Sequence, residues 1–91
     1  MNKPMFELGQ TVITPACLEL LEQQGKSPEE FLARHHSGDW GVICEDDKQM
    51  NEEALRGGSR LMSVYETERG NIWIISEADR NSTTLLLPNE Y

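Results

Sequence analysis

The spacing of hydrophobic residues changes from a helical to a strand period near Gly57-Gly58. Before this point apolar residues recur every three to four positions, and after it they alternate with polar ones. Arg60–Glu66, Asn71–Glu77 and Ser82–Leu87 are short segments separated by turn residues, which is typical of a three-stranded antiparallel meander. Helices that precede strands in this way predict an α+β fold.

The N-terminal half predicts one strand and three short helices. Met5–Ile13, broken at Gly9-Gln10, is expected to be a strand that joins one edge of the sheet. Thr14-Pro15 and Ser27-Pro28 signal helix starts, because a capping side chain precedes a proline that suits the first helical position. Ser27 and Glu30 are further expected to form a reciprocal capping box.

The third helix is expected to begin near Glu45-Asp46-Asp47, since three acidic residues suit the positive end of the helix dipole. It should end at Gly57-Gly58. Residues 1–91 are short enough to form a single domain. The predicted architecture is one sheet with the helices on one face.

The predicted core consists of apolar residues on the inner faces of these elements. Its members are Leu18, Leu21, Phe31, Leu32, Trp40, Met50, Leu55, Ile72, Ile74, Leu85 and Leu87. Two cysteines are too few for a disulfide scaffold, so both are expected to be reduced. Cys17 lies on an apolar helix face and is expected to act as a small core residue.

The net charge of −8 limits the kinds of partner. A phosphate backbone would be repelled, because nucleic-acid affinity comes mainly from Lys and Arg, so no direct nucleic-acid binding is expected. No run approaches the ~18 apolar residues of a membrane helix. Glu7 and Gly9 interrupt any signal-peptide core, so we expect a cytoplasmic chain without a membrane partner.

Residues 39–53 carry most of the excess charge and predict an acidic face on the third helix. Its members are Glu45, Asp46, Asp47, Glu52 and Glu53. Such a face can attract a protein partner with a basic surface. The alternative is that these acids only keep the chain in solution, with Glu52 pairing with Arg56 one helical turn away.

Two polar segments form a second candidate site for acid–base chemistry or for a polar ligand. Its residues are His36, Asp39, Trp40, Glu77, Asp79 and Arg80. The alternative is structural. In that interpretation His35 packs in the core and Trp40 plugs its end. Asp39 and Asp79 then accept from backbone amides, and Arg80 pairs with a carboxylate.

No metal and no cofactor are expected. His35, His36, Asp39 and Cys44 include metal-ligand types, but adjacent histidines on a helix point about 100° apart. No phosphate loop or nucleophile–base motif occurs in the sequence. A Cys44 nucleophile assisted by His36 would rest on proximity alone, so the sequence does not favour an enzyme.

Three segments resemble a family of small bacterial proteins labelled plasmid-related or hypothetical, some of them as a type I restriction subunit. These segments are His36–Gly41, Trp73–Arg80 and Thr83–Pro88, and the resemblance runs from about Thr14 to Tyr91. It implies a setting of mobile DNA in bacteria and supplies no catalytic residue. A restriction methyltransferase subunit would need a far larger cofactor fold.

The resemblance and the acidic face together suggest a non-enzymatic protein-binding module of a mobile element. Its target could be a host-defence nuclease, which it would inhibit. Two other hypotheses stay open. One is a small enzyme or ligand-binding domain that uses the His36–Trp40 segment and the Glu77–Arg80 turn, and the other is an antitoxin-like regulator.

Overall fold

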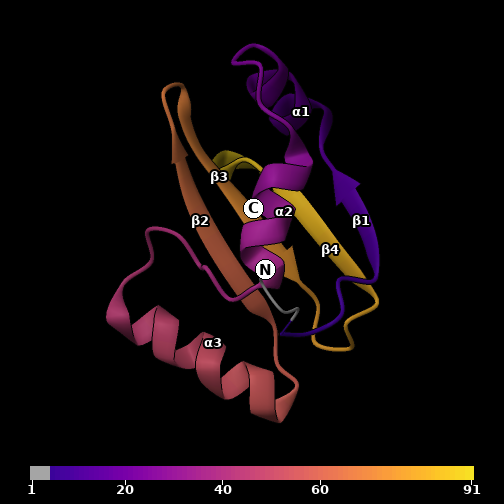
Figure 1. Cartoon of the computed structure of the whole chain (residues 1–91), viewed down its shortest axis with the longest axis vertical. Coiled ribbons are helices and arrows are strands. Elements are labelled where there is room, and N and C mark those ends of the chain that lie inside the picture. The colour runs from indigo at the N-terminus through magenta and orange to yellow at the C-terminus, as the bar shows by residue number, and fades with distance from the viewer. Residues whose placement is uncertain (1–4) are drawn as a thin grey trace.

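The computed structural model describes residues 5–91 and contains a four-stranded sheet with three α-helices in that part of the chain (Figure 1). In chain order the elements are β1 (Gln10–Ile13), α1 (Pro15–Glu22), α2 (Pro28–His36), α3 (Glu45–Gly57), β2 (Leu61–Thr67), β3 (Gly70–Ser76), β4 (Ser82–Leu86) and the 3-10 turn η1 (Pro88–Glu90). The strand order is β1-β4-β3-β2. Strands β2, β3 and β4 form the expected antiparallel meander, and β1 joins the edge parallel to β4. The α+β prediction is confirmed.

Strand β1 is shorter than the sequence predicted, because only Gln10–Ile13 of the expected Met5–Ile13 pairs in the sheet. The chain turns at Gly9, whose φ of 67° lies in the left-handed region. A Cβ atom at this position would lie 2.4 Å from the backbone of Asn81. The turn directs Phe6 onto the Trp40 ring, with 6.2 Å between the ring centroids.

Side-chain caps begin the first two helices, as predicted. Thr14 Oγ1 accepts from the Cys17 amide at 3.2 Å, and Ser27 Oγ accepts from the Glu29 amide at 3.1 Å. The capping box predicted between Ser27 and Glu30 is wrong, because the Glu30 amide donates to the Ser27 backbone carbonyl instead. The carboxylate that accepts from the Ser27 hydroxyl belongs to Glu29.

The core lies between the sheet and the helices α1 and α2. Its buried residues are Cys17, Leu21, Phe31, Tyr65, Ile72, Ile74 and Leu85. A second buried cluster, Trp40, Ala54 and Leu61, joins α3 to the first residue of β2. Figure 1 shows α2 crossing in front of the sheet and α3 beside one end of β2.

Six of the predicted core residues are buried, namely Leu21, Phe31, Trp40, Ile72, Ile74 and Leu85. Leu18, Leu32, Leu55 and Leu87 are half-buried. The prediction for Met50 is wrong, since its side chain is 64% exposed. Helix α3 buries Asn51 and Ala54, three positions apart, and Met50 lies about 100° away from Asn51 around the helix.

Candidate functional site

The acidic face predicted on the third helix is exposed on α3. All of its members are exposed: Glu45, Asp46, Asp47, Glu52 and Glu53. Among the described residues, ion pairs join only Arg34 with Asp39 and Arg60 with Glu77. The Glu52–Arg56 pair considered in the sequence analysis therefore does not form. The acidic face has no cationic partner within residues 5–91.

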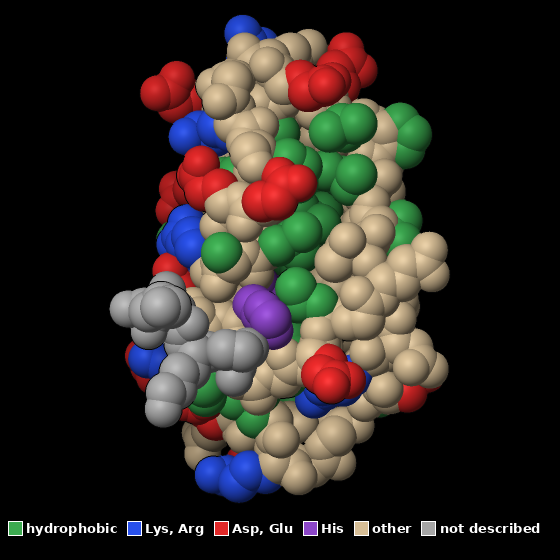
Figure 2. Space-filling model, turned by 45° about the vertical axis from the view of Figure 1, so that its right-hand side comes forward, with side chains coloured by type: hydrophobic (Ala, Val, Ile, Leu, Met, Phe, Trp, Pro, Cys, Tyr) green, Lys and Arg blue, Asp and Glu red, His purple; other side chains and the backbone are tan. Residues whose placement is uncertain are grey.

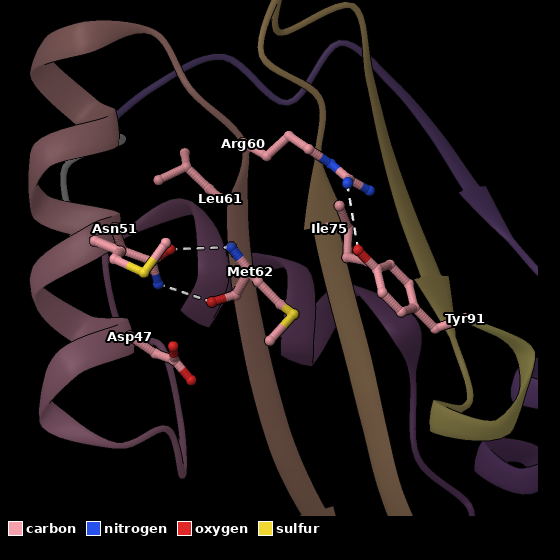
Figure 3. A pocket seen from close by; sticks show the side chains of 8 residues that line it. Asp47, Asn51, Arg60, Leu61, Met62, Ile75 and Tyr91 are labelled. Carbon is pink, nitrogen blue, oxygen red and sulfur yellow. Dashed lines mark hydrogen bonds between the residues drawn. The ribbon is translucent and has the colours of Figure 1, made fainter.

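A hollow of about 210 Å³ lies directly beside this acidic face (Figure 3). Its walls come from α3, from the ends of β2 and β3, and from the C-terminus: Asp47, Met50, Asn51, Arg60, Leu61, Met62, Ile75 and Tyr91. Met50 and Tyr91 are 64% and 66% exposed. Methionine, tyrosine and arginine are enriched where proteins contact one another, so the composition of these walls suits a protein partner.

Asn51 holds α3 against the edge of β2 and so fixes the shape of the hollow. Its Nδ2 donates to the Met62 carbonyl at 2.7 Å, and its Oδ1 accepts from the Met62 amide at 3.1 Å (Figure 3). The Asn51 side chain thus satisfies the backbone of an edge strand as a neighbouring strand would. Because Met50 precedes Asn51 on α3, these two hydrogen bonds also place Met50 in the wall of the hollow.

The His36–Trp40 segment is a structural turn. The Arg34 guanidinium donates to Asp39 Oδ2 at 2.8 Å and holds the pKa of that carboxyl below its usual range. Asp39 Oδ1 also accepts from the Gly41 amide at 3.2 Å, and the Asp39 carbonyl accepts from the Tyr65 hydroxyl at 2.6 Å. Trp40 is 5% exposed and packs in the core, as the structural alternative predicted.

The Glu77–Arg80 segment is a second structural turn. Arg80 Nη1 donates to the carbonyls of Ser59 and Glu77 at 2.6 and 2.9 Å, and Nη2 donates to the Ala54 carbonyl at 3.0 Å. The predicted pairing of Arg80 with a carboxylate is therefore wrong, because its guanidinium binds backbone oxygens near the end of α3. Asp79 Oδ1 accepts from the Asn81 amide at 2.9 Å, as the structural alternative predicted.

The six residues of the polar candidate site come from two separate segments of the chain. Phe6 connects the two segments, since its ring lies 6.2 Å from the Trp40 ring and 5.8 Å from the Arg80 guanidinium. His36 lines a hollow together with residues 5–9, and the other five do not line it. The structure therefore brings the two segments to one aromatic side chain.

A buried chain of hydrogen bonds, which the sequence did not reveal, runs from β2 through α2 to β4. His35 Nδ1 contacts Ser63 Oγ, and His35 Nε2 lies 2.9 Å from Ser76 Oγ. Ser76 Oγ lies 2.7 Å from Thr83 Oγ1, which donates to the Leu8 carbonyl at 2.7 Å. The side chains of His35, Ser63, Ser76 and Thr83 are fully buried.

The direction of the hydrogen bonds between Leu8 and His35 follows from the last acceptor in this chain. The Leu8 carbonyl can only accept, so Thr83 donates to it and Ser76 donates to Thr83. His35 then donates from Nε2 to Ser76, and in the neutral ring Nδ1 accepts from the Ser63 hydroxyl. This arrangement requires a neutral imidazole. Burial lowers the pKa of His35 to about 3, and the positive charges of His36 and Arg80 act in the same direction.

The predicted metal-ligand types are separated in the fold. Both ring nitrogens of His35 are engaged, Asp39 is paired with Arg34, and Cys44 is exposed where α3 begins. Over residues 5–91, no group of three or more His, Cys, Asp or Glu side chains is placed to hold a metal ion. Burial raises the pKa of the Cys17 thiol to about 11, with Glu90 acting in the same direction, so this cysteine is not an activated nucleophile.

Comparisons with protein-family models, with curated proteins and with solved structures find no match to this chain. The family resemblance and the function suggested with it therefore stay predictions. None of the helices in the described part of the chain has the length and apolar character needed to cross a membrane.

Proposed function

We propose that this chain is a non-enzymatic binding module that captures a basic protein through one surface of α3. This α3 surface comprises Glu45, Asp46, Asp47, Met50, Glu52 and Glu53 together with the adjoining hollow. The observation that carries the proposal is Met50, an apolar side chain 64% exposed within the acidic face. Charge repulsion between chains explains exposed acids without a partner, but it does not explain why the exposed side chains of Met50 and Tyr91 lie together with Met62 around one hollow.

The α3 surface indicates the chemistry of its partner. An apolar side chain that enters the hollow would contact Met50, Met62 and Tyr91. Lys or Arg residues around that anchor would face the carboxylates of α3, which have no ion-pair partner among residues 5–91. Association would then combine a desolvated apolar centre with charge attraction at the rim.

In the bacterial, mobile-DNA setting implied by the family resemblance, we propose a cytoplasmic nuclease of the host defence as the class of partner. A nuclease must carry Lys and Arg to neutralise the phosphates of its substrate. Carboxylates on a rigid helix could occupy that basic surface and exclude the nucleic acid. The alternative of an enzyme or ligand-binding domain gains no support from the His36–Trp40 and Glu77–Arg80 segments, since their polar groups are used within the fold.

The test is capture from a bacterial lysate by the tagged chain and by two charge-matched variants. Glu52→Lys with Glu53→Lys reverses two charges of the α3 surface beyond the first helical turn, where dipole effects no longer matter. Glu66→Lys with Glu68→Lys makes the same charge change on exposed residues around the β2–β3 turn. We expect the first variant to lose the partner and the second to retain it.

Salt provides a second criterion for the same complex. Exposed charges are screened over about 8–10 Å at physiological ionic strength, so capture should weaken as salt rises. Equal capture by both variants, or a complex unaffected by molar salt, would show that the acidic face is only a solvated surface. A wild-type chain that enriches no protein would contradict the proposal as well.

A further inference from the structure

The outer edge of β1 is open in the described part of the chain. Strand β1 is the outermost strand in the order β1-β4-β3-β2. The Gln10 amide donates to the Asn81 carbonyl, in the turn before β4, at 2.9 Å, and the Thr14 amide donates to the Leu85 carbonyl in β4 at 3.0 Å. Backbone groups alternate along a strand, so the amides and carbonyls of Thr11 and Ile13 point away from β4. These four groups have no hydrogen-bond partner among the described residues.

The opposite edge of the sheet is closed by the protein itself. Asn51 binds the amide and carbonyl of Met62, as described above. The Val64 amide donates to the Trp40 carbonyl at 3.0 Å, and the Val64 carbonyl accepts from the Val42 amide at 2.7 Å. Proteins commonly protect edges by covering them or by placing Pro or charged residues there, and β1 contains neither type of residue. The backbone of the β2 edge is therefore hydrogen-bonded within the protein, whereas that of the β1 edge is open among residues 5–91.

A groove runs beside the open edge, between β1 and α2. This β1 groove has a volume of about 150 Å³ and is lined by Thr11, Val12, Ile13, Pro28, Glu29, Leu32 and Leu85. Figure 2, which brings this side of the molecule forward, shows a band of hydrophobic side chains with acidic side chains next to it. An edge strand beside an apolar groove offers backbone hydrogen bonds and a side-chain pocket at once.

We propose that β1 accepts an extended basic peptide as a fifth strand of the sheet, with apolar side chains of the peptide in the β1 groove. Strand addition takes its affinity from main-chain hydrogen bonds and its specificity from pockets for alternate side chains. Glu29 lines the groove and Glu30 follows it, both exposed, so Lys or Arg between the apolar positions would be favoured. A second copy of this chain is disfavoured as the occupant, because each copy carries a net charge of −8.

This inference is independent of the α3 surface, which lies at the β2 edge of the sheet. The test is amide hydrogen exchange, measured by NMR with a synthetic seven-residue peptide of alternating lysine and valine. In the free chain the amides of Thr11 and Ile13 should exchange rapidly, whereas those of Val12 and Thr14 should be protected. Saturating peptide should slow exchange at Thr11 and Ile13 at least tenfold. A matched peptide with proline at its centre should bind at least tenfold more weakly, since proline lacks an amide donor.

Two variants and a control assign the peptide to this edge. Thr11→Pro removes an amide that the sheet does not use, and Leu32→Lys places a positive charge in the groove without changing the strand. Either variant should weaken binding of the lysine–valine peptide at least tenfold, while Val42→Thr, at an exposed apolar residue outside the β1 groove, should retain it. Unchanged exchange at Thr11 and Ile13 with the peptide present would overturn the proposal. Protection of these amides that grows with protein concentration alone would also overturn it, because the occupant would then be a second copy.

Discussion

Two polar regions of this chain differ in where their polar groups find partners. In the buried chain of hydrogen bonds around His35, the hydroxyls of Ser63, Ser76 and Thr83 all find partners inside the fold. On the α3 surface, five carboxylates have no ion-pair partner among residues 5–91, and the same helix exposes the apolar side chain of Met50. The contrast teaches that residue type alone does not mark a binding surface. Polar groups satisfied internally maintain the fold, and groups left without partners are available to another molecule.

The largest effect is expected from His35→Ala. The substitution leaves the hydroxyls of Ser63 and Ser76 without their partner and opens a cavity in the core. Together these should lower the free energy of unfolding by about 3–5 kcal/mol, measured by urea denaturation. The matched control is His36→Ala, whose half-buried ring should account for less than about 1 kcal/mol. Similar losses in the two variants would contradict the role assigned to the buried chain of hydrogen bonds.

A smaller effect is expected from mild acid. The pKa of His35 is about 3 in the folded chain and 6.5 in the unfolded chain, so the unfolded chain takes up the proton first as the pH falls. The stability that comes from the neutral imidazole is complete above about pH 6.5 and is lost progressively toward pH 3. At pH 5 the loss should be about 2 kcal/mol relative to pH 7.5, measured by urea denaturation at both pH values. His36→Ala should keep most of this loss, because burial is the main cause of the low pKa of His35 and the charge of His36 adds less. An equal stability of the wild type at both pH values would contradict the account.

Arg80→Ala should have a smaller effect still, on stability and not on binding. The variant loses the donors to Ala54, Ser59 and Glu77, at about 1–2 kcal/mol of unfolding free energy. It also places alanine at a φ of 60°, so Arg80→Gly should be less destabilised by about 1 kcal/mol. Capture of the partner should be unchanged in both variants. A variant that keeps its stability but loses capture would return Arg80 to the candidate site.

The elements of the fold could be predicted because their signals are local. Thr14, Ser27 and Gly58 act at the helix ends where the sequence placed them, and the alternation over 60–87 produced the meander. Met50 was misassigned because the three-to-four spacing fits two adjacent helix faces, and only the contact of Asn51 with Met62 selects between them. The helical spacing of apolar residues alone could not show which face of α3 is buried.

The candidate site could be predicted only in part. The acidic face was predicted from the excess of acidic residues in 39–53, and all of its members are exposed on α3. The hollow depends on Arg60, Ile75 and Tyr91, which the sheet and the C-terminal turn bring beside α3. The buried chain of hydrogen bonds likewise requires β2, β3 and β4 in one register with His35 above them. No local pattern in the sequence encodes either of these long-range arrangements.

The central claim is that the α3 surface contacts a protein partner, and site-specific photo-crosslinking tests it most directly. A photoreactive amino acid at Met50 should form a covalent adduct with the partner captured from the lysate. The same amino acid at Glu68, which is also exposed in the β2–β3 turn, should form none. We predict an adduct at Met50 that disappears when Glu52→Lys and Glu53→Lys are added. An adduct at Glu68 of equal yield, or one at Met50 that persists after both charge reversals, would contradict the account.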